Sequence, residues 1–254
     1  MCGIAGFVQR GWRPQDAQPV LEGMLDAIRH RGPDDQGTWL DPEAGVALGH
    51  RRLSILELTQ AGHQPMACPS GRHLVIFNGE IYNHLELRET LRRAGCEPAW
   101  RGHSDTETLL ACIRAWGIAR TLQACTGMFA LAVWDRERRT LTLARDRLGE
   151  KPLYHGWQDG SFLFGSELKA LRCHPAFAGT PDWDAAAAFL RLAYVPTPQT
   201  IYQGIRKLPA GTMLTLGPEE LATRREPGGL LVARGSRGAR GGAPVRRQLC
   251  RRRR

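Results

Sequence analysis

Met1-Cys2-Gly3-Ile4-Ala5-Gly6-Phe7 is the stretch around which this chain is organised. Removal of the initiator methionine places a thiol and a free α-amine on one residue, Cys2. An α-amine has a reference pKa of about 8 and a thiol about 8.5, so the amine can take the thiol proton and return it to a leaving amine. The glycines permit close backbone approach beside the sulfur, and Ile4 and Phe7 can anchor a strand in a core. A second-position cysteine alone carries little weight, so the interpretation depends on the downstream motifs.

Length and composition are those of a folded protein without a membrane span. The 254 residues suffice for one large or two small domains, and 42% of them are apolar. No apolar run approaches the ~20 residues of a membrane helix, and the N-terminus lacks the pattern of a signal peptide. The seven cysteines are odd in number and never in C-x-x-C spacing. We therefore expect no disulfide framework, no metal site and a reducing, cytoplasmic location.

The net charge of +10 is confined to the end of the chain. Residues 224–254 contain 11 arginines and one acid, whereas residues 1–223 hold 24 basic and 24 acidic side chains. A basic excess ordinarily suggests nucleic acid. This tail has no interleaved aromatic residues and no helical spacing, so we do not expect it to bind nucleic acid.

Hydrophobic periodicity predicts alternating helices and strands. Leu21, Met24, Leu25 and Ile28 have helical spacing up to Gly32-Pro33. The run at 128–134 is continuous and apolar, and a second strand at 73–77 is apolar through 74–77, as expected of buried strands. Further strands are expected at 38–40, 46–50, 141–144, 152–157, 161–164 and 212–216, and helices at 87–94, 109–116, 167–171 and 184–192.

Turn and capping signals set the ends of these elements. Asn78-Gly79 ordinarily indicates a hairpin turn, so the strand from 73 either continues or turns there. Asn83 with Glu86, and Ser104 with Glu107, are capping-box patterns that predict helix starts. Asp105 would then lie in the first helical turn, where the helix dipole favours a carboxylate.

The motifs together resemble the class II, N-terminal-nucleophile glutamine amidotransferase domain, most closely that of bacterial glutamine-hydrolysing asparagine synthetase. Each motif alone is weak, but their order and spacing are specific, and the resemblance covers residues 1–216. The motifs are Met1-Cys2-Gly3-Ile4-Ala5-Gly6, His30-Arg31-Gly32-Pro33-Asp34, Arg52-Leu53-Ser54-Ile55, Asn78-Gly79-Glu80-Ile81-Tyr82-Asn83, Ser104-Asp105, Thr126-Gly127-Met128-Phe129-Ala130 and the segment 145–154.

The resemblance implies an α+β fold, a four-layer αββα sandwich of two antiparallel sheets. It also implies a reaction in which Cys2 attacks the side-chain amide of glutamine, with Asn78 and the Gly79 N–H as the oxyanion hole. Arg52 matches the position that holds the substrate carboxylate, and Glu80 and Asp105 match those near its ammonium. Leu53 and Ile55, from the Arg52 motif, complete the implied substrate-binding set. A zwitterion requires one cation and one or two carboxylates held apart, which agrees with this assignment.

The family's synthetase half has a Ser-Gly-Gly-x-Asp-Ser nucleotide loop, and this sequence contains none. We therefore expect no cofactor for the glutaminase half, while ATP and Mg²⁺ would belong to the missing half that amidates aspartate. Glutamine is the expected partner, with the synthetase domain normally in cis, and a homodimer is left open. The alternatives are the amidotransferase half of a sugar-phosphate or purine-pathway enzyme, and an inactive truncated remnant.

Residues 217–254 are expected to form an Arg/Gly-rich tail that does not fold. From residue 224 onward the segment is rich in Arg, Gly, Ala and Pro, the residues of GC-rich codons, and it has no aromatic residue. It therefore has little with which to offset an ordering entropy of roughly 1–2 kcal/mol per residue. A frameshift accounts for the composition and for the position at which the resemblance ends.

Overall fold

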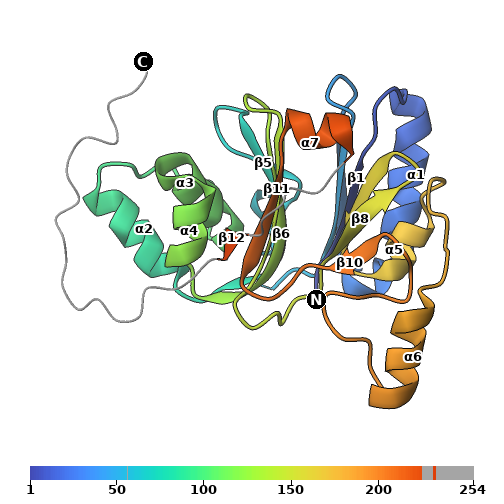
Figure 1. Ribbon diagram of the computed structural model, residues 1–254. Helices are drawn as coiled ribbons and strands as arrows, with labels where there is room; N and C mark the ends of the chain where they lie inside the picture. Colours follow the sequence, from blue (N-terminus) through green and yellow to red (C-terminus); the bar gives the residue numbers. More distant parts are fainter. Residues whose placement is uncertain (56, 225–230, 233–254) are drawn as a thin grey trace.

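Two antiparallel sheets lie face to face between two layers of helices (Figure 1). The computed structural model describes residues 1–55, 57–224 and 231–232. Helices α2, α3 and α4 cover one outer face, and α1 and α5 cover the other. The predicted α+β, four-layer αββα architecture is confirmed.

Each sheet has six strands. The first sheet has the order β10-β8-β9-β1-β3-β2, and the second has the order β12-β11-β7-β6-β5-β4. The strands of the first are β1 (Gly3–Val8), β2 (Asp35–Asp41), β3 (Val46–Arg52), β8 (Tyr154–Gln158), β9 (Ser161–Gly165) and β10 (Ile205–Lys207). Those of the second are β4 (Met66–Ala67), β5 (His73–Ile81), β6 (Gly127–Asp135), β7 (Thr140–Arg145), β11 (Thr212–Leu216) and β12 (Leu231–Val232).

The helices follow the predicted periodicity, with additional short ones. They are α1 (Pro14–Ala27), α2 (His84–Arg93), α3 (Asp105–Trp116), α4 (Ile118–Ala124), α5 (Leu168–Arg172), α6 (Trp183–Leu192) and α7 (Pro218–Thr223), with 3-10 turns at Arg29–Arg31 and Gln60–Gly62. Helix α4 and strands β4 and β10 were not predicted, because each is too short to show a period.

Three apolar layers hold the sandwich together. The inter-sheet layer includes Ile4, Leu48, Ile76 and Trp134, all at most 1% exposed. A second apolar cluster joins the second sheet to α2, α3 and α4, and a third joins the first sheet to α1 and α5. The N-terminal strand β1 is buried along its whole length between β3 and β9, which places Cys2 at one end of the inter-sheet space.

Local signals at the helix starts were only partly correct. The Asn83–Glu86 capping box is wrong: the Asn83 side chain instead accepts from the Thr126 N–H (2.8 Å) and donates to the Ala124 carbonyl (3.0 Å). Its amide is used to join two loops, so it does not cap α2. Ser104 does cap α3, through its Oγ and the Thr106 N–H at 3.1 Å.

Asn78-Gly79 is not a turn. Both residues lie inside β5 and pair with Ala130 and Phe129 of β6. The continuous ladder with β6 outweighs the local turn preference, so the hairpin alternative is rejected.

The chain keeps regular structure beyond residue 216. Helix α7 packs against the inter-sheet layer through Leu221, and β12 pairs with β11. This part of the expected tail therefore forms a helix and a strand. The rest of the expectation, for residues 225–230 and 233–254, lies outside the described residues.

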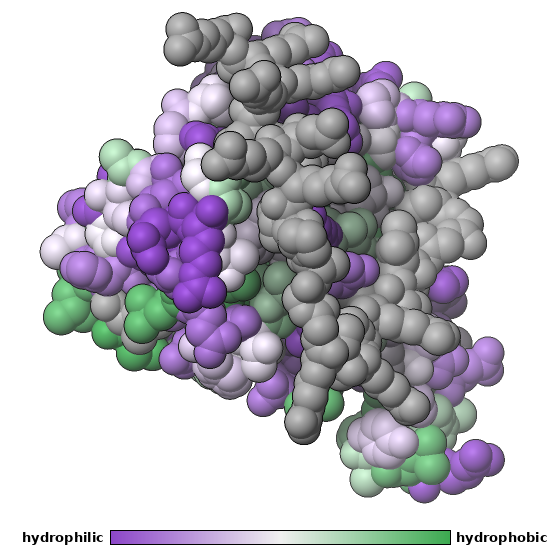
Figure 2. All heavy atoms as spheres, turned by 90° about the vertical axis from the view of Figure 1, so that its left-hand side faces the viewer, coloured by the Kyte–Doolittle hydropathy of each residue, from purple (hydrophilic) through white to green (hydrophobic). Residues whose placement is uncertain are grey.

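Helix α6 carries an exposed apolar face. Trp183 and Leu190 are 75% and 86% exposed, and Phe189 is 51% exposed. Figure 2 shows hydrophobic atoms gathered at the lowest part of the molecule, where Figure 1 places α6. Within the described ranges, no helix combines the length and hydrophobicity that crossing a membrane requires.

Replacing Leu48 by alanine should lower the free energy of unfolding by about 2–5 kcal/mol, because the side chain is fully buried between the sheets. Leu190→Ala is the matched control, and we expect a change below about 0.5 kcal/mol at that exposed position. Urea unfolding of both variants measures the difference. Equal effects would contradict the assignment of the inter-sheet layer as the stabilising core.

Candidate active site

One cavity, of ≈ 100 Å³, brings together all the site residues expected from the sequence. It lies where the start of β1 and the end of β3 face the edge of β5. The expected residues among its walls are Cys2, Arg52, Leu53, Ile55, Asn78, Gly79, Glu80 and Asp105. Figure 1 places the N-terminus between the two sheets.

The Cys2 thiol is held by the backbone of Leu53. The Leu53 N–H donates to Sγ at 3.4 Å, and the thiol donates to the Leu53 carbonyl at 3.6 Å. Burial raises the pKa of the Cys2 thiol, while the Leu53 N–H and the nearby Arg52 guanidinium oppose that shift. Leu53 thus contacts the Cys2 sulfur through its backbone N–H and carbonyl. Its position directly after β3 places that backbone beside the start of β1.

Arg31 fixes the backbone at Cys2. Its Nε donates to the Cys2 carbonyl at 2.9 Å, and its Nη1 pairs with Glu167 at 2.9 Å. Two hydrogen bonds to Ser166 hold the start of β1. The Ile4 N–H donates to Ser166 Oγ at 3.0 Å, and the Ser166 N–H donates to the Ile4 carbonyl at 2.9 Å. The Arg31 motif was quoted in the sequence, but its clamp on Cys2 was not foreseen.

The register of β5 decides where its N–H groups point. Tyr82 N–H bonds to Thr126 O, and Arg136 N–H to Arg72 O, so the even-numbered residues of β5 exchange hydrogen bonds with β6. The odd-numbered residues therefore direct their N–H groups to the opposite edge. On that edge β4 is only two residues long and pairs only as far as Val75.

Past the end of β4, side chains replace the missing strand. Gln64 Oε1 accepts from Phe77 N–H at 2.7 Å, and Asp105 Oδ2 accepts from Ile81 N–H at 2.9 Å. Gly79 lies between them on the same edge. Within the described part of the chain its N–H has no acceptor, and Gly79 borders the cavity.

Asn78 supplies a second unpaired donor. The residue is 1% exposed, and its Nδ2 is buried without a hydrogen-bond acceptor among the described residues. A Cβ at Gly79 would lie 2.2 Å from the Met128 carbonyl oxygen, so the close β5–β6 approach requires glycine there. Two donors from adjacent residues are thus available at one cavity.

Asp105 is the first residue of α3 and is 6% exposed. Burial raises the pKa of its carboxyl to about 6, although the Ile81 N–H works in the opposite direction. Glu80 is half-buried, and its charge adds to the rise in the Asp105 pKa. The two carboxyl groups form one acidic side of the cavity.

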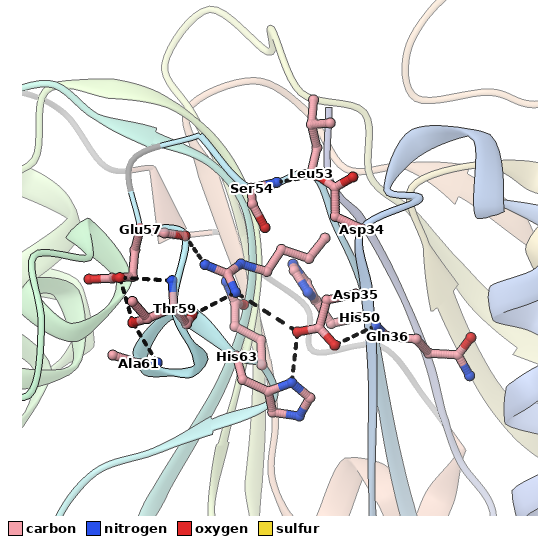
Figure 3. A network of polar contacts seen from close by, with 12 residues as sticks. Asp34, Asp35, Gln36, His50, Leu53, Ser54, Glu57, Thr59, Ala61 and His63 are labelled. Atoms are coloured by element: carbon pink, nitrogen blue, oxygen red, sulfur yellow. Dashed lines mark hydrogen bonds and ion pairs between the residues drawn. The ribbon is translucent and has the colours of Figure 1, made fainter.

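Arg52 is already hydrogen-bonded in this structure. Its guanidinium donates to the carbonyls of Glu57 and Thr59 (3.0 Å for Thr59), and Asp35 lies 3.9 Å away (Figure 3). His63 pairs with the same Asp35 at 2.8 Å. Arg52 therefore holds the loop after β3 against the start of β2 while it lines the cavity.

His50 ties the two sheets together beside the site. Its ring lies in β3, and Nε2 is 3.0 Å from the Phe77 carbonyl of β5, so this nitrogen must carry the donated proton. Full burial lowers the pKa of His50 to about 4, which keeps the ring neutral. The bond fixes the peptide immediately before Asn78.

Several cavity residues were missed by sequence reasoning. They include Gln64, Glu57, Met128 and Lys151, whose Nζ contacts Met1 Sδ at 3.3 Å. Met128 and Lys151 fall within quoted motifs but were given no role, Gln64 and Glu57 fall in none, and each reaches the cavity through tertiary packing. No group of His, Cys, Asp and Glu suited to a metal ion occurs in the ranges that the structure describes.

Solved structures share this fold. Glutamine phosphoribosylpyrophosphate amidotransferase from B. subtilis, solved with ADP and GMP, superposes with a TM-score of 0.60. The match covers 86% of this chain and 48% of that one at 20% identity. The two sheets and their helices thus have the same fold as that enzyme.

The model of the glutamine amidotransferase domain family matches residues 1–225, and the chain belongs to that family. It is 37% identical over 224 residues to asparagine synthetase [glutamine-hydrolyzing] 3 of Bacillus subtilis, a match that covers 87% of this chain. A putative asparagine synthetase [glutamine-hydrolyzing] of Mycobacterium bovis is 37% identical over 238 residues. The chain spans 36% of the length of each of these relatives.

Replacing Asp105 by asparagine should change how stability depends on pH. The folded state binds the Asp105 proton more tightly than the unfolded state, because its pKa is raised to about 6. This proton binding adds its full contribution to the free energy of unfolding below about pH 4, and the contribution is lost as the pH rises through about 6. The free energy of unfolding of wild type relative to Asp105→Asn should therefore fall by roughly 3 kcal/mol between pH 4 and pH 7.

Urea unfolding at both pH values measures this difference. Asp184→Asn, an exposed change in the first turn of α6, is the matched control and should show no such trend. A pH-independent difference for Asp105→Asn would show that its carboxyl is not desolvated.

Proposed function

We propose that this chain hydrolyses glutamine to glutamate and ammonia through a thioester on Cys2. The observation that carries the proposal is the pairing of the Cys2 thiol with two unpaired donors, Asn78 Nδ2 and the Gly79 N–H, at one cavity. An acyl-transfer enzyme needs this combination of nucleophile and oxyanion donors. Membership of the amidotransferase family agrees with it.

Cys2 acts as the mature N-terminal residue in this proposal. Once Met1 is removed, the α-amine accepts the thiol proton and Sγ attacks the amide carbon of glutamine. The amine then protonates the departing ammonia, and water releases glutamate from the thioester. The contacts of Cys2 with Leu53 and Arg31 support this role, since they fix the sulfur and the backbone without using the α-amine.

The oxyanion of the tetrahedral intermediate would lie against Asn78 and Gly79. Neither donor needs to break an existing bond to reach it, so no reorganisation opposes the reaction. The Gln64 and Asp105 side chains occupy the neighbouring N–H groups of β5 and leave only the one at Gly79 open. On this edge of β5, only the Gly79 N–H is therefore free to act together with Asn78 Nδ2.

The ends of the cavity suit a zwitterionic amino acid. Arg52 supplies the cation for the α-carboxylate, while Asp105 and Glu80 supply the carboxylates for the α-ammonium. Leu53 and Ile55 would contact the substrate between these ends. Because Arg52 is bonded to the Glu57 and Thr59 carbonyls, substrate binding requires the guanidinium to share or exchange those bonds.

The ammonia is proposed to serve ATP-dependent amidation of aspartate in the reducing cytoplasm. The support is the similarity to glutamine-hydrolysing asparagine synthetases, of whose length this chain spans 36%. ATP and Mg²⁺ would be bound by a synthetase domain, and the glutaminase site itself needs no cofactor in this scheme. The likeness to a phosphoribosylpyrophosphate amidotransferase, at 20% identity, concerns the fold alone.

Mass spectrometry should find the purified chain without Met1, and a glutamine-analogue electrophile should label Cys2 only. Cys2→Ala should abolish glutaminase activity because no other residue supplies the nucleophile. Cys173→Ala, at an exposed cysteine, is the matched control and should retain full activity. Labelling elsewhere, or activity in Cys2→Ala, would refute the proposal.

Asn78→Ala should lower kcat about 10²–10³-fold through loss of one oxyanion donor. Arg52→Ala should instead raise the KM for glutamine strongly, because its role is in substrate binding. A small neutral thiol reagent should still alkylate Cys2 in both variants. Steady-state kinetics separates the two effects, and an unchanged KM in Arg52→Ala would remove Arg52 from the substrate site.

A further inference from the structure

Lys151 is a buried basic residue in the wall of the cavity that holds Cys2. It is 5% exposed and lies in the connection between β7 and β8. Its backbone is fixed on both sides, since its N–H donates to Asp146 Oδ2 at 3.1 Å and its carbonyl accepts from Arg145 Nε at 2.7 Å. The side chain therefore enters the cavity wall from a fixed point.

Lys151 differs from the two arginines beside the N-terminal nucleophile in having no carboxylate partner. Arg31 pairs with Glu167 at 2.9 Å, and Arg52 lies 3.9 Å from Asp35. No carboxylate of the described residues lies within ion-pair distance of Lys151 Nζ, whose one hydrogen bond there is to Met1 Sδ at 3.3 Å. A thioether is a weak acceptor, and an ammonium has three N–H groups to donate.

The partner of this ammonium is the residue that the proposed function removes. Met1 lines the cavity with Lys151, so its loss takes away the Sδ acceptor and opens the wall beside Nζ. The same step creates the α-amine of Cys2. Met1 Sδ and the Cys2 nitrogen belong to adjacent residues, so Nζ lies within about 10 Å of the new amine.

Two amines at one cavity repel each other when both carry a proton. Burial strengthens this repulsion, because charges away from water are screened much less than exposed ones. The reference pKa is about 10.4 for a lysine side chain and about 8 for an α-amine, so the α-amine gives up its proton first. The charge on Lys151 therefore favours the neutral form of the α-amine.

Building on the proposed function, we propose that Lys151 is a positioning residue that acts through Cys2, its charge keeping the α-amine unprotonated for catalysis. The neutral amine has the lone pair that accepts the thiol proton as Sγ attacks the amide carbon, and the same proton then passes to the departing ammonia. Lys151 keeps its own proton throughout. Burial raises the pKa of the Cys2 thiol, so the thiol needs such a base.

The other charged groups around the α-amine are Arg31, Arg52, Glu57, Glu80 and Asp105. The two arginines act in the same direction as Lys151, but each has a carboxylate nearby that reduces its effect. The three carboxylates favour the protonated amine. In the proposed function Glu80 and Asp105 serve the ammonium of the substrate, which leaves the unpaired Lys151 to oppose protonation of the base.

Protonation of the α-amine can be titrated without the glutaminase reaction. The Cys2→Ala chain, freed of Met1 by methionine aminopeptidase and checked by mass spectrometry, keeps the α-amine and lacks the thiol that would interfere with acylation. Acetic anhydride is applied between about pH 5 and pH 10, and mass spectrometry follows acetylation of the N-terminal peptide. In this chain Lys151→Met, which keeps the bulk and removes the charge, should raise the pH midpoint by about one unit. Lys151→Arg should keep the original midpoint.

The glutaminase reaction of the chain that retains Cys2 gives a second measurement. Lys151→Met should move the acid limb of kcat/KM to higher pH by the same amount, a loss of about 10-fold on that limb that is recovered at alkaline pH. Lys151→Arg should restore the profile. Lys207→Met is the matched control, because this lysine lies outside the cavity and bonds to the Val195 carbonyl, so the acid limb should not move.

An unchanged acetylation midpoint in Lys151→Met would overturn the proposal for Lys151, as would a loss of activity that is equal at every pH. A chain without glutaminase activity would instead refute the proposed function, and the acetylation midpoints would still decide whether Lys151 controls the amine. Should Lys151→Met fail to fold, Lys151→Gln is titrated in the same way.

Discussion

The short length of β4 is the constraint from which the candidate active site follows. A strand edge must find partners for its N–H groups, and beyond Val75 none of the described strands offers them to this edge of β5. Gln64 and Asp105 supply two of these partners from outside the sheet. The remaining N–H, at Gly79, stays available, and the register with β6 sets its direction. The proposed oxyanion donor is thus the one N–H left open on a sheet edge whose N–H groups are bonded on both sides of it.

The proposed nucleophile, Cys2, lies at the start of the opposite sheet, so the candidate site depends on how the two sheets are held together. The inter-sheet apolar layer sets their separation, and the bond from His50 to the Phe77 carbonyl links β3 directly to the strand that carries Asn78. Arg31 and Glu167 hold the start of β1 from the other side. Alignment of sulfur and donors is therefore a property of the whole sandwich, and no single loop could provide it.

Much of this arrangement was predictable from the sequence because its signals are local. Helix α3 lies between a Ser104 cap and Gly117, and β6 is a continuous apolar run, so both were found. Asn83 was misassigned because its amide is used by a loop distant in sequence. Gln64, Lys151 and the Arg31 clamp could not be found, since only tertiary packing brings them to Cys2. The resemblance to a family located the eight expected residues, but it did not show that Arg52 bonds to loop carbonyls.

The central position of β1 also determines when the site can exist during synthesis. Ala5 pairs with Gly165, and Ile4 bonds to Ser166, across some 160 residues of sequence. Such long-range pairing must wait for loop closure, which makes it slow relative to local helix formation. Strand β1 is therefore enclosed on its β9 side only after most of this domain has been made. Until then β1 lacks one of its two neighbouring strands, so residue 2 is made long before its surroundings are complete.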